Sequence, residues 1–158
     1  MTCTPIGVIR SPFAAREGMP IQPTGTRAAP GRVEIDPAYR EGLADLDGFS
    51  HVILLYRFHE SRGFDLKVVP FMDDQERGVF ATRAPRRPNA IGLSVVELEK
   101  VEDGVLHVRN LDVLDGTPLL DVKPYVPRFD APAGPVRTGW IAAAGRDVGA
   151  QAADDRFA

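Results

Sequence analysis

Short segments that alternate apolar and polar residues make up most of the chain, and turn-forming residues separate them. The clearest pair runs from Ile91 to Val101 and from Val105 to Leu111, joined through Glu102-Asp103-Gly104. Asp-Gly between two alternating segments is typical of a two-residue hairpin turn, because both positions of that turn need a positive φ. The pattern therefore predicts an antiparallel hairpin.

Further extended segments are predicted on both sides of this hairpin. Ile6 and Val8 alternate with polar neighbours up to Ser11-Pro12, as in a half-buried strand. The other segments are 32–35, 64–71, and 119–123, the last of which follows the turn Asp115-Gly116-Thr117-Pro118. These segments favour a series of short antiparallel strands.

One segment is continuously apolar. It runs from His51 to Glu60 (HVILLYRFHE), is too short for a long helix, and is rich in β-branched and aromatic residues. We interpret it as a central strand buried on both faces. His59 and Glu60 stand where the apolar residues end, so they either line a site at the strand end or mark the exit to solvent.

A helix is predicted from Asp36 to Asp47, because Asp36 can cap it and Tyr39, Leu43 and Leu46 recur at helical spacing. Strands and helices do not otherwise alternate along the chain. Many short strands with one or two short helices predict a mostly β fold, a small antiparallel β-barrel rather than a doubly wound sheet.

The densest group of charged side chains lies between Gly78 and Ser94, GVFATRAPRRPNAIGLS. A strand-like GVFAT leads to Arg83, Arg86 and Arg87, whose planar, permanently charged forks suit carboxylate or phosphate groups. Two prolines stiffen the same loop and lower the entropy lost on binding. The alternative is a stiff connection whose arginines are simply solvated.

Two segments lack periodicity. Residues 14–31 contain turns but no apolar pattern, which indicates either a ligand-binding lid or a floppy insertion. The chain beyond 131 is rich in Ala, Gly and Pro, and Trp140 is expected to dock on the barrel or on a partner subunit. We therefore divide the chain into a barrel domain at 1–130 and a C-terminal tail at 131–158.

Composition is that of an ordinary globular domain: 158 residues, 44% hydrophobic and 26% charged. The net charge of -3 argues against a uniformly basic nucleic-acid binder, but the clustered arginines leave room for a local basic patch. We find no Walker loop and no GxGxxG fingerprint, so the usual nucleotide-binding motifs are missing.

The cysteine and histidine content, together with the first residues of the chain, indicates the cellular compartment and whether a metal site is expected. Cys3 is the one cysteine, and the three histidines follow no zinc-binding spacing, so we expect neither a disulfide nor a metal site. The start of the chain does not resemble a signal peptide, and no apolar segment is long enough to span a bilayer. A cytoplasmic protein without a membrane partner is expected.

Several sequence blocks together resemble the TrmO family of tRNA methyltransferases, also called TsaA-like or YaeB-like. They follow the family's order and spacing and cover most of residues 5–128. The blocks are IGVIRSP at Ile6 to Pro12, Phe49-Ser50-His51 leading to Phe58-His59, GVFATR at Gly78 to Arg83, Arg87-Pro88-Asn89 with Ile91-Gly92, and LDVLDGTPLLDVKPY at Leu111 to Tyr125.

This resemblance implies a small β-barrel that binds S-adenosyl-L-methionine and works as a homodimer. It also implies a reaction, methylation of N6 of threonylcarbamoyladenosine beside the anticodon, with a tRNA anticodon stem-loop as partner. The cofactor is expected to contact residues matching the family's site: Gln22, Pro23, Thr24, His59, Glu60, Arg83, Leu93, Asp115, Gly116, Thr117 and Pro118.

Roles within such a site follow from chemistry. Arg83 is the best partner for the cofactor carboxylate. A carbamoylated nitrogen is a poor nucleophile, so an acceptor for its proton would help, and His59, Asp115 and Asp121 are all candidates. The negative charges of the substrate are expected to bind Arg86, Arg87 and Lys123.

Two other function classes compete with the methyltransferase. A small barrel could sense S-adenosyl-L-methionine or a nucleotide without chemistry, as a regulatory module. A hydrolase using His59 and an aspartate is the other, but no nucleophile motif supports it. Transfer of a labelled methyl group would separate the methyltransferase from both.

Overall fold

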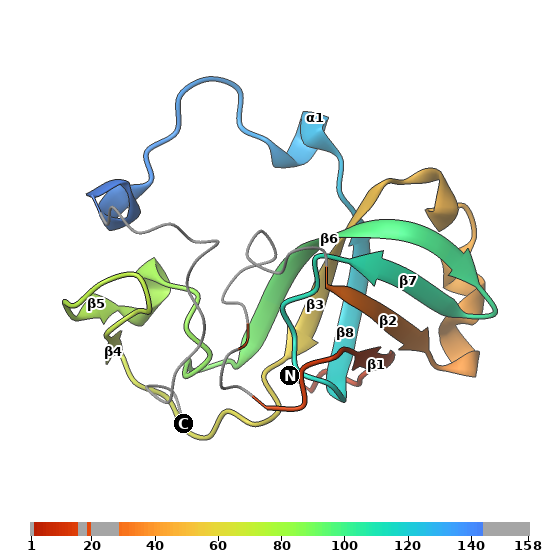
Figure 1. The fold of residues 1–158 in the computed structure, drawn as a ribbon, viewed down its shortest axis with the longest axis horizontal. Coiled ribbons are helices and arrows are strands. Elements are labelled where there is room, and N and C mark those ends of the chain that lie inside the picture. Colours follow the sequence, from red (N-terminus) through yellow and green to blue (C-terminus); the bar gives the residue numbers. More distant parts are fainter. Residues whose placement is uncertain (1, 16–18, 20–28, 144–158) are drawn as a thin grey trace.

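A closed antiparallel barrel forms the body of the molecule in this computed structural model, which describes residues 2–15, 19 and 29–143. Six strands close it in the order β1-β2-β7-β6-β3-β8 (Figure 1). The predicted mostly β fold is confirmed. The strands are β1 (Gly7–Arg10), β2 (Pro30–Ile35), β3 (His51–Arg57), β6 (Ile91–Glu102), β7 (Val105–Arg109) and β8 (Thr117–Pro124).

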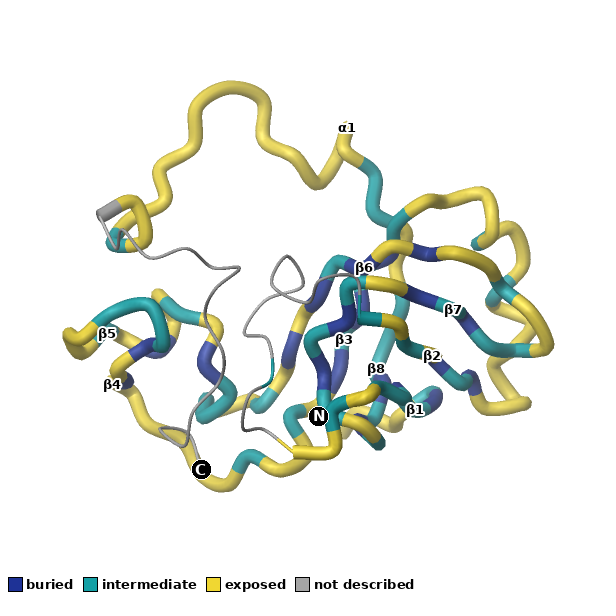
Figure 2. Tube along the Cα trace, in the orientation of Figure 1, coloured by how far each residue is buried: buried dark blue, intermediate teal, exposed yellow. Residues whose placement is uncertain are grey.

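Alternating residues of these strands fill the barrel. Figure 2 shows the buried positions concentrated in the barrel strands. The interpretation of 51–60 as a strand buried on both faces is wrong: Val52, Leu54 and Tyr56 are buried, whereas Ile53 and Leu55 are half-buried. A barrel seals only the inner face of each strand, so apolar residues on the outer face keep contact with solvent.

The hairpin formed by β6 and β7 confirms its sequence prediction. Asp103 and Gly104 both have positive φ, 52° and 81°, as a primed two-residue turn requires. Glu102 pairs with Val105 directly before and after this turn. The Asp-Gly pair therefore sets the register of the hairpin.

The inward-facing residues of β1 are one position away from those that the sequence pattern predicts. Its buried positions are Gly7 and Ile9, not Ile6 and Val8, although Ile6 packs against the core from outside the strand. A Cβ at Gly7 would lie 2.2 Å from the carbonyl oxygen of Glu34 on β2. A glycine in this position lets the two strands approach, and the apolar pattern does not reveal that close contact.

The helix predicted for 36–47 is replaced by two short 3₁₀ helices, η2 (Pro37–Leu43) and η3 (Leu46–Gly48). Asp36 makes no side-chain capping hydrogen bond, and Asp45 between the two helices has a left-handed backbone with φ 64°. No residue of either helix is buried. Leu43 and Leu46 pack against the core only as partly buried side chains, which is too little packing for a continuous α-helix.

Residues 58–90 leave the barrel between β3 and β6 and form a projection that we call the arm (Figure 1). It contains the two-stranded sheet of β4 (Lys67–Val68) and β5 (Arg77–Gly78), followed by the 3₁₀ helix η4 (Val79–Ala81). A small core holds it together, made by Val68, Val79, Ala84 and the partly buried Phe71.

Two sequence interpretations fail within the arm. GVFAT is a 3₁₀ turn rather than a strand beyond its first residue, and 64–71 is extended only at Lys67–Val68. Both segments are short and lack partners among the barrel strands. Strand propensity without a neighbouring strand to pair with does not suffice for a longer sheet.

The chain beyond β8 returns to the arm. It passes through α1 (Pro127–Asp130) to η5 (Gly139–Ala143), which lies beside the arm in Figure 1. Trp140 Nε1 donates a 2.8 Å hydrogen bond to the carbonyl of Ala81, and the Arg77 guanidinium lies 5.7 Å from the centre of the indole ring. Within this chain, Trp140 therefore contacts the arm.

We predict that Gly7→Ala destabilises the barrel by about 1–3 kcal/mol, because the added methyl group must push β1 away from the backbone of β2. Chemical denaturation measures the change in the free energy of unfolding. Gly42→Ala is the control, since nothing lies within 4 Å of its Cβ position, and it should be neutral or slightly stabilising. Equal effects of the two substitutions would contradict the strand-contact explanation.

Candidate functional site at the mouth of the barrel

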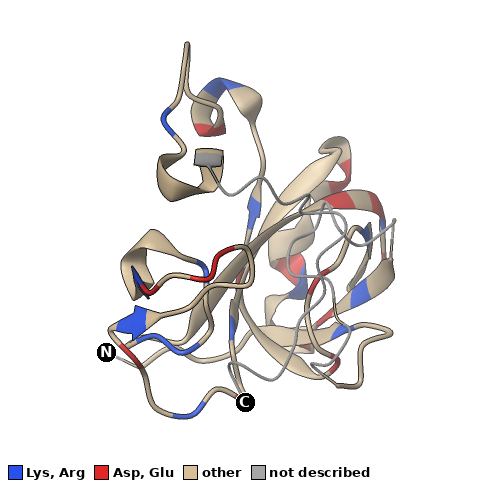
Figure 3. Ribbon diagram, turned by 60° about the vertical axis from the view of Figure 1, so that its left-hand side comes forward, with Lys and Arg blue, Asp and Glu red and all other residues tan. Residues whose placement is uncertain are grey.

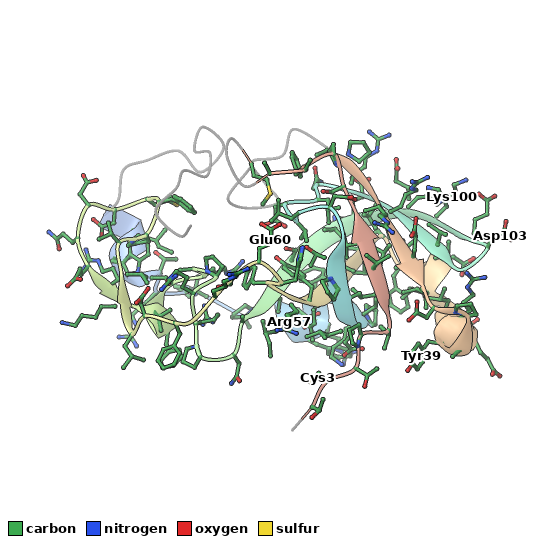
Figure 4. All side chains as sticks on the ribbon, turned by 90° about the horizontal axis from the view of Figure 1, so that it is seen from below. Cys3, Tyr39, Arg57, Glu60, Lys100 and Asp103 are labelled. Atoms are coloured by element: carbon green, nitrogen blue, oxygen red, sulfur yellow. The ribbon has the colours of Figure 1, made fainter. Side chains whose placement is uncertain are left out.

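Polar residues from distant parts of the sequence meet at one end of the barrel. We call this end the mouth: it is where β3 ends, where β6 and β8 begin, and where the arm leaves. Glu60 lies between the barrel and the arm in Figure 4, whereas Tyr39 and Asp103 lie at the opposite end. Among the described residues, the buried polar side chains are Ser94 and Thr117.

Thr117 holds His59 at the mouth. The Thr117 hydroxyl and His59 Nδ1 are 3.2 Å apart, and Thr117 is 3% exposed at the start of β8. Either atom can donate, depending on the histidine tautomer. The contact brings a residue from the end of β3 and one from the 115–118 turn together, and both belong to the predicted cofactor set.

The turn at 115–118 is fastened to the end of β1. Asp115 Oδ1 accepts a 3.1 Å hydrogen bond from the Ser11 amide, and its Oδ2 lies 3.9 Å from Arg10 Nη1. The Gly116 amide donates to the Ile9 carbonyl at 2.9 Å, with Gly116 at φ 76°. The Asp115 carboxylate thus already has two partners within the fold, and the turn is rigidly placed.

A series of three hydrogen-bonded oxygen atoms lies inside the mouth, and sequence reasoning predicted none of the three residues that provide them. The Tyr56 hydroxyl is 3.0 Å from the hydroxyl of the fully buried Ser94, which in turn donates to Asp112 Oδ1 at 2.5 Å. The available signal was the polar serine at an inward position of β6. It could not be interpreted without knowing which residue faces it from the segment after β7.

Burial shifts the pKa values of two of these three residues, Asp112 and Tyr56. It raises the pKa of the Asp112 carboxyl to about 6, although the Ser94 hydrogen bond and the positive charge of Arg83 oppose the shift. Burial likewise raises the pKa of the Tyr56 hydroxyl, as does the negative charge of Asp112, whereas Ser94 and Arg83 lower it. Burial is the largest cause of both shifts, and it favours the protonated form of each group.

The other two arginines of the loop have partners inside the arm. Arg87 Nη1 donates to the carbonyls of Thr82 and Ala84, at 3.1 and 3.3 Å, and so fixes the loop that carries Arg83. Arg86 Nε pairs with Asp65 Oδ2 at 2.7 Å. Arg87 therefore stabilises the loop conformation, and Arg86 takes part in an ion pair at the surface.

Some predicted site residues are not at the mouth. Asp121 pairs with Leu55 on the outer face of the barrel, and its carboxylate accepts an ion pair from Lys123 at 2.8 Å. Four residues along β8 separate it from Thr117, about 13 Å at the usual rise of a strand. Leu93 also points outward and is 45% exposed. The predicted contacts of Gln22, Pro23 and Thr24 lie outside the described residues.

A cleft of about 740 Å³ lies at the opposite end, between the 3₁₀ helices and the barrel. Its lining is mainly apolar and includes Tyr39, Leu43, Leu46, Phe49 and Val122. No buried polar side chain or buried ionisable group converges there in the described part of the chain. Binding specificity needs such groups, so we place the candidate site at the mouth.

Residues 2–15, 19 and 29–143 contain neither a group of metal-ligand side chains nor a helix that could span a membrane. No three or more His, Cys, Asp and Glu side chains in these ranges are grouped so that they could hold a metal ion. None of the helices in these ranges has the length and apolar character needed to cross a membrane.

Comparison with known proteins identifies the fold and its relatives. Residues 8–131 match the family model "tRNA-methyltransferase O N-terminal domain". A protein from Pyrococcus abyssi named "Probable S-adenosyl-L-methionine-binding protein" is 50% identical over 137 residues, which cover 87% of this chain and 74% of that protein. The mouse "tRNA (adenine(37)-N6)-methyltransferase" is 42% identical over 135 residues. The match covers 81% of this chain and 31% of the mouse protein.

A solved structure supports the same relationship. The crystal structure of TrmO from Pseudomonas aeruginosa superposes with a TM-score of 0.73 at 45% identity. The match covers 88% of this chain and 62% of that chain. The present chain thus spans less than two thirds of the Pseudomonas protein and about a third of the mouse protein.

We predict that Asp112→Asn stabilises the protein at pH 7.5 by about 1–2 kcal/mol, a value discounted for partial exposure. The pKa of Asp112 is raised above its ordinary value of 3.8, so the ionised form costs stability. The difference should shrink as the pH falls from about 6 to 4 and vanish below, where wild type is protonated in both states.

Denaturation of wild type and variant at pH 4, 6 and 7.5 measures this difference. Asparagine keeps an oxygen that accepts the Ser94 hydrogen bond, so the comparison isolates the charge. Asp121→Asn, on the outer face, is the control and should show no such pH-dependent gain. An Asp112→Asn variant that is less stable than wild type at pH 7.5 would contradict the assignment of a partly buried, destabilising carboxylate.

Proposed function

The chain belongs to the family of the tRNA-methyltransferase O N-terminal domain, and we propose that it is an S-adenosyl-L-methionine-dependent tRNA methyltransferase. The observation that carries this proposal is the group of polar side chains at the mouth, where Tyr56, Ser94 and Asp112 are linked by hydrogen bonds and Thr117 contacts His59. The name of the Pyrococcus abyssi relative supports the cofactor, and the name of the mouse relative supports the reaction class.

The residues at the mouth fit the cofactor. S-adenosyl-L-methionine has a carboxylate that suits the planar fork of Arg83, and an adenine edge that suits backbone groups of the 115–118 turn. His59 and Glu60 complete the proposed contacts around it, whereas Leu93, on the outer face of the barrel, is left out of this set. When bound, the cofactor supplies an electrophilic methyl group, and the protein's part is to position the acceptor and exclude water.

For the substrate we propose N6 of threonylcarbamoyladenosine beside the anticodon. The mouse relative is named for N6 of adenine 37, which supports the position of the reaction. The threonyl carboxylate beside that nitrogen suits a second arginine fork on the same loop, which is Arg86. Its present partner Asp65 is half-exposed, and exchanging one surface ion pair for another costs little.

Of the three proposed proton acceptors, His59 has the most suitable position. Thr117 holds its ring at the mouth, whereas Asp115 is engaged by Ser11 and Arg10, and Asp121 lies on the outer face. We therefore assign the role of general base to His59. Figure 3 shows basic and acidic residues interspersed over barrel and arm, so we propose that the grip on tRNA is local and involves Arg87 on the arm. Lys123 lies toward the other end of β8, paired with Asp121, and is not part of this local contact.

We further propose that the protein is a homodimer. The outer face of β3 and β6 carries the cross-strand pairs Ile53–Val95 and Leu55–Leu93, next to Ile91, which is 46% exposed. Contiguous exposed apolar residues on a sheet face are typical of an interface. A second copy of the chain is the proposed occupant.

The substrate proposal predicts selective methylation. Two tRNA preparations, one from cells that make the threonylcarbamoyl group and one from cells that cannot, are incubated with enzyme and labelled S-adenosyl-L-methionine. We expect incorporation only into the first, because unmodified adenosine offers no carboxylate to Arg86, which then keeps its surface ion pair with Asp65 and contributes nothing to binding. Equal incorporation would reject the substrate, and no incorporation into either would favour a binding module without catalysis.

The dimer proposal predicts a twofold larger mass for wild type than for Ile91→Glu in sedimentation at micromolar concentration. A charge in the centre of an apolar interface is desolvated and unpaired, which weakens association. Val136→Glu, which introduces the same charge at an exposed apolar residue beyond α1, should leave the dimer intact. A monomeric wild type would refute the proposal.

A further inference from the structure

Residues 127–140, which we call the strap, lead from the end of β8 that lies opposite the mouth back to the arm. All residues of the strap up to Gly139 are exposed, as Figure 2 shows, and Trp140 is the first that is half-buried. Trp140 Nε1 donates its 2.8 Å hydrogen bond to the carbonyl oxygen of Ala81. The indole of Trp140 therefore anchors the strap to the arm.

The indole ring has a second partner on the arm. The Arg77 guanidinium lies over the ring, 5.7 Å from its centre, which is the distance of a cation–π contact. The same guanidinium is held by Asp73 Oδ2, which lies 2.7 Å from Nε and 2.6 Å from Nη2. Because Asp73 restricts Arg77, the ring meets a cation whose position is already fixed. The anchor thus combines a hydrogen bond with a cation–π contact.

The arm has little packing of its own. Its strands β4 and β5 pair over two residues each, and its small core consists of Val68, Val79, Ala84 and the partly buried Phe71. A two-stranded sheet of this size is at best marginally stable in water. Contacts from outside the arm therefore help to decide how firmly its loops are held.

The hydrogen bond to Ala81 acts on the loop that carries Arg83. Ala81 is the last residue of η4, where helical carbonyls need partners outside the helix. The Thr82 amide and hydroxyl both donate to the first carbonyl of η4, and the hydroxyl accepts from the Ala84 amide at 3.3 Å. The Arg87 guanidinium then binds the carbonyls of Thr82 and Ala84. Residues 81–87 thus form one hydrogen-bonded unit, which Trp140 holds at its beginning.

We propose that Trp140 is a positioning residue: its indole joins the strap to the arm and thereby fixes the loop that carries Arg83. This inference rests on the proposed function, in which Arg83 binds the cofactor carboxylate. A loop that is ordered before the ligand arrives loses less conformational entropy on binding. When a smaller fraction of molecules has the loop in the binding conformation, the apparent affinity falls in proportion, so release of the strap weakens binding.

This coupling between strap and ligand acts in both directions. If the Trp140 contact favours binding of a ligand, binding of that ligand favours the contact by the same factor. Trp140 is the one tryptophan of the sequence, so its fluorescence reports on this contact without a second indole. Binding of S-adenosylhomocysteine should therefore lower the access of a soluble quencher to the indole. Methylthioadenosine, which has the same nucleoside but no amino-acid carboxylate, is the control and should change this access less.

The main test is calorimetric titration of wild type and strap variants with the same two ligands. We expect Trp140→Ala to weaken S-adenosylhomocysteine binding about fivefold, as for the loss of one hydrogen bond, and methylthioadenosine binding less than about twofold. Trp140→Phe keeps an aromatic ring but lacks the N–H donor, so its effect should be intermediate. Phe129→Ala, which removes a 79% exposed ring from the same strap, is the matched control and should leave both affinities unchanged.

Two further measurements separate positioning from general damage to the fold. In an Arg83→Ala background, Trp140→Ala should not weaken S-adenosylhomocysteine binding further, because the side chain that it positions is gone. Amide hydrogen exchange tests the strap without any ligand. The amides of Thr82 and Ala84 should exchange faster in Trp140→Ala than in wild type, whereas the amides of β3 and β6 should stay protected.

Each alternative result overturns a defined part of the account. Unchanged S-adenosylhomocysteine affinity in Trp140→Ala refutes the positioning role, and so do equal losses for both ligands or a full effect that persists in the Arg83→Ala background. Quencher access that S-adenosylhomocysteine leaves unchanged refutes the coupling. Unchanged exchange at Thr82 and Ala84 refutes the anchoring of the loop by the strap. If wild type binds neither ligand, the proposed function fails, and the exchange rates still decide whether Trp140 holds the loop.

Discussion

Closure of the barrel between β1 and β8 is the constraint on which the rest of the structure depends. β1 pairs with β2 on one side and with β8 on the other, with Ile9 opposite Thr117. A closed ring leaves no edge strand and seals one face of each strand from water. Polar side chains on that face need internal partners, and Ser94 and Thr117 find theirs at the mouth. Closure therefore decides where ionisable chemistry can be located.

The arm completes the site because of how it is joined to the barrel. It is inserted between β3 and β6, which pair directly from His51–Glu97 to Arg57–Ile91. The Phe58 amide donates to the Ala90 carbonyl at 2.8 Å, so the two ends of the arm meet at the mouth. A long excursion between neighbouring strands thus begins and ends at the mouth, directly after Tyr56 on β3 and directly before β6, which carries Ser94.

The sequence predicted the parts of this fold that local chemistry controls. Asp103-Gly104 specified the hairpin turn, and the alternation in 91–101 specified its strand. The failures have a common cause, which is that the deciding partner is distant in sequence. The inner face of β1 depends on the approach of Glu34 to Gly7, and the roles of Ser94 and Asp112 depend on Tyr56 from another strand. The resemblance to a known family named His59 and Thr117 as site residues, and the structure brings these two into contact, but the resemblance did not indicate the hydrogen-bonded Tyr56, Ser94 and Asp112.

The central claim is that the cofactor binds at the mouth and not in the apolar cleft at the other end. Two-dimensional amide NMR of the ¹⁵N-labelled protein, titrated with S-adenosylhomocysteine, tests this most directly. The account predicts shifts for the amides of Tyr56, Ser94, Asp112 and Thr117, with those of Tyr39, Leu43 and Phe49 unchanged. Shifts confined to the cleft residues would contradict it.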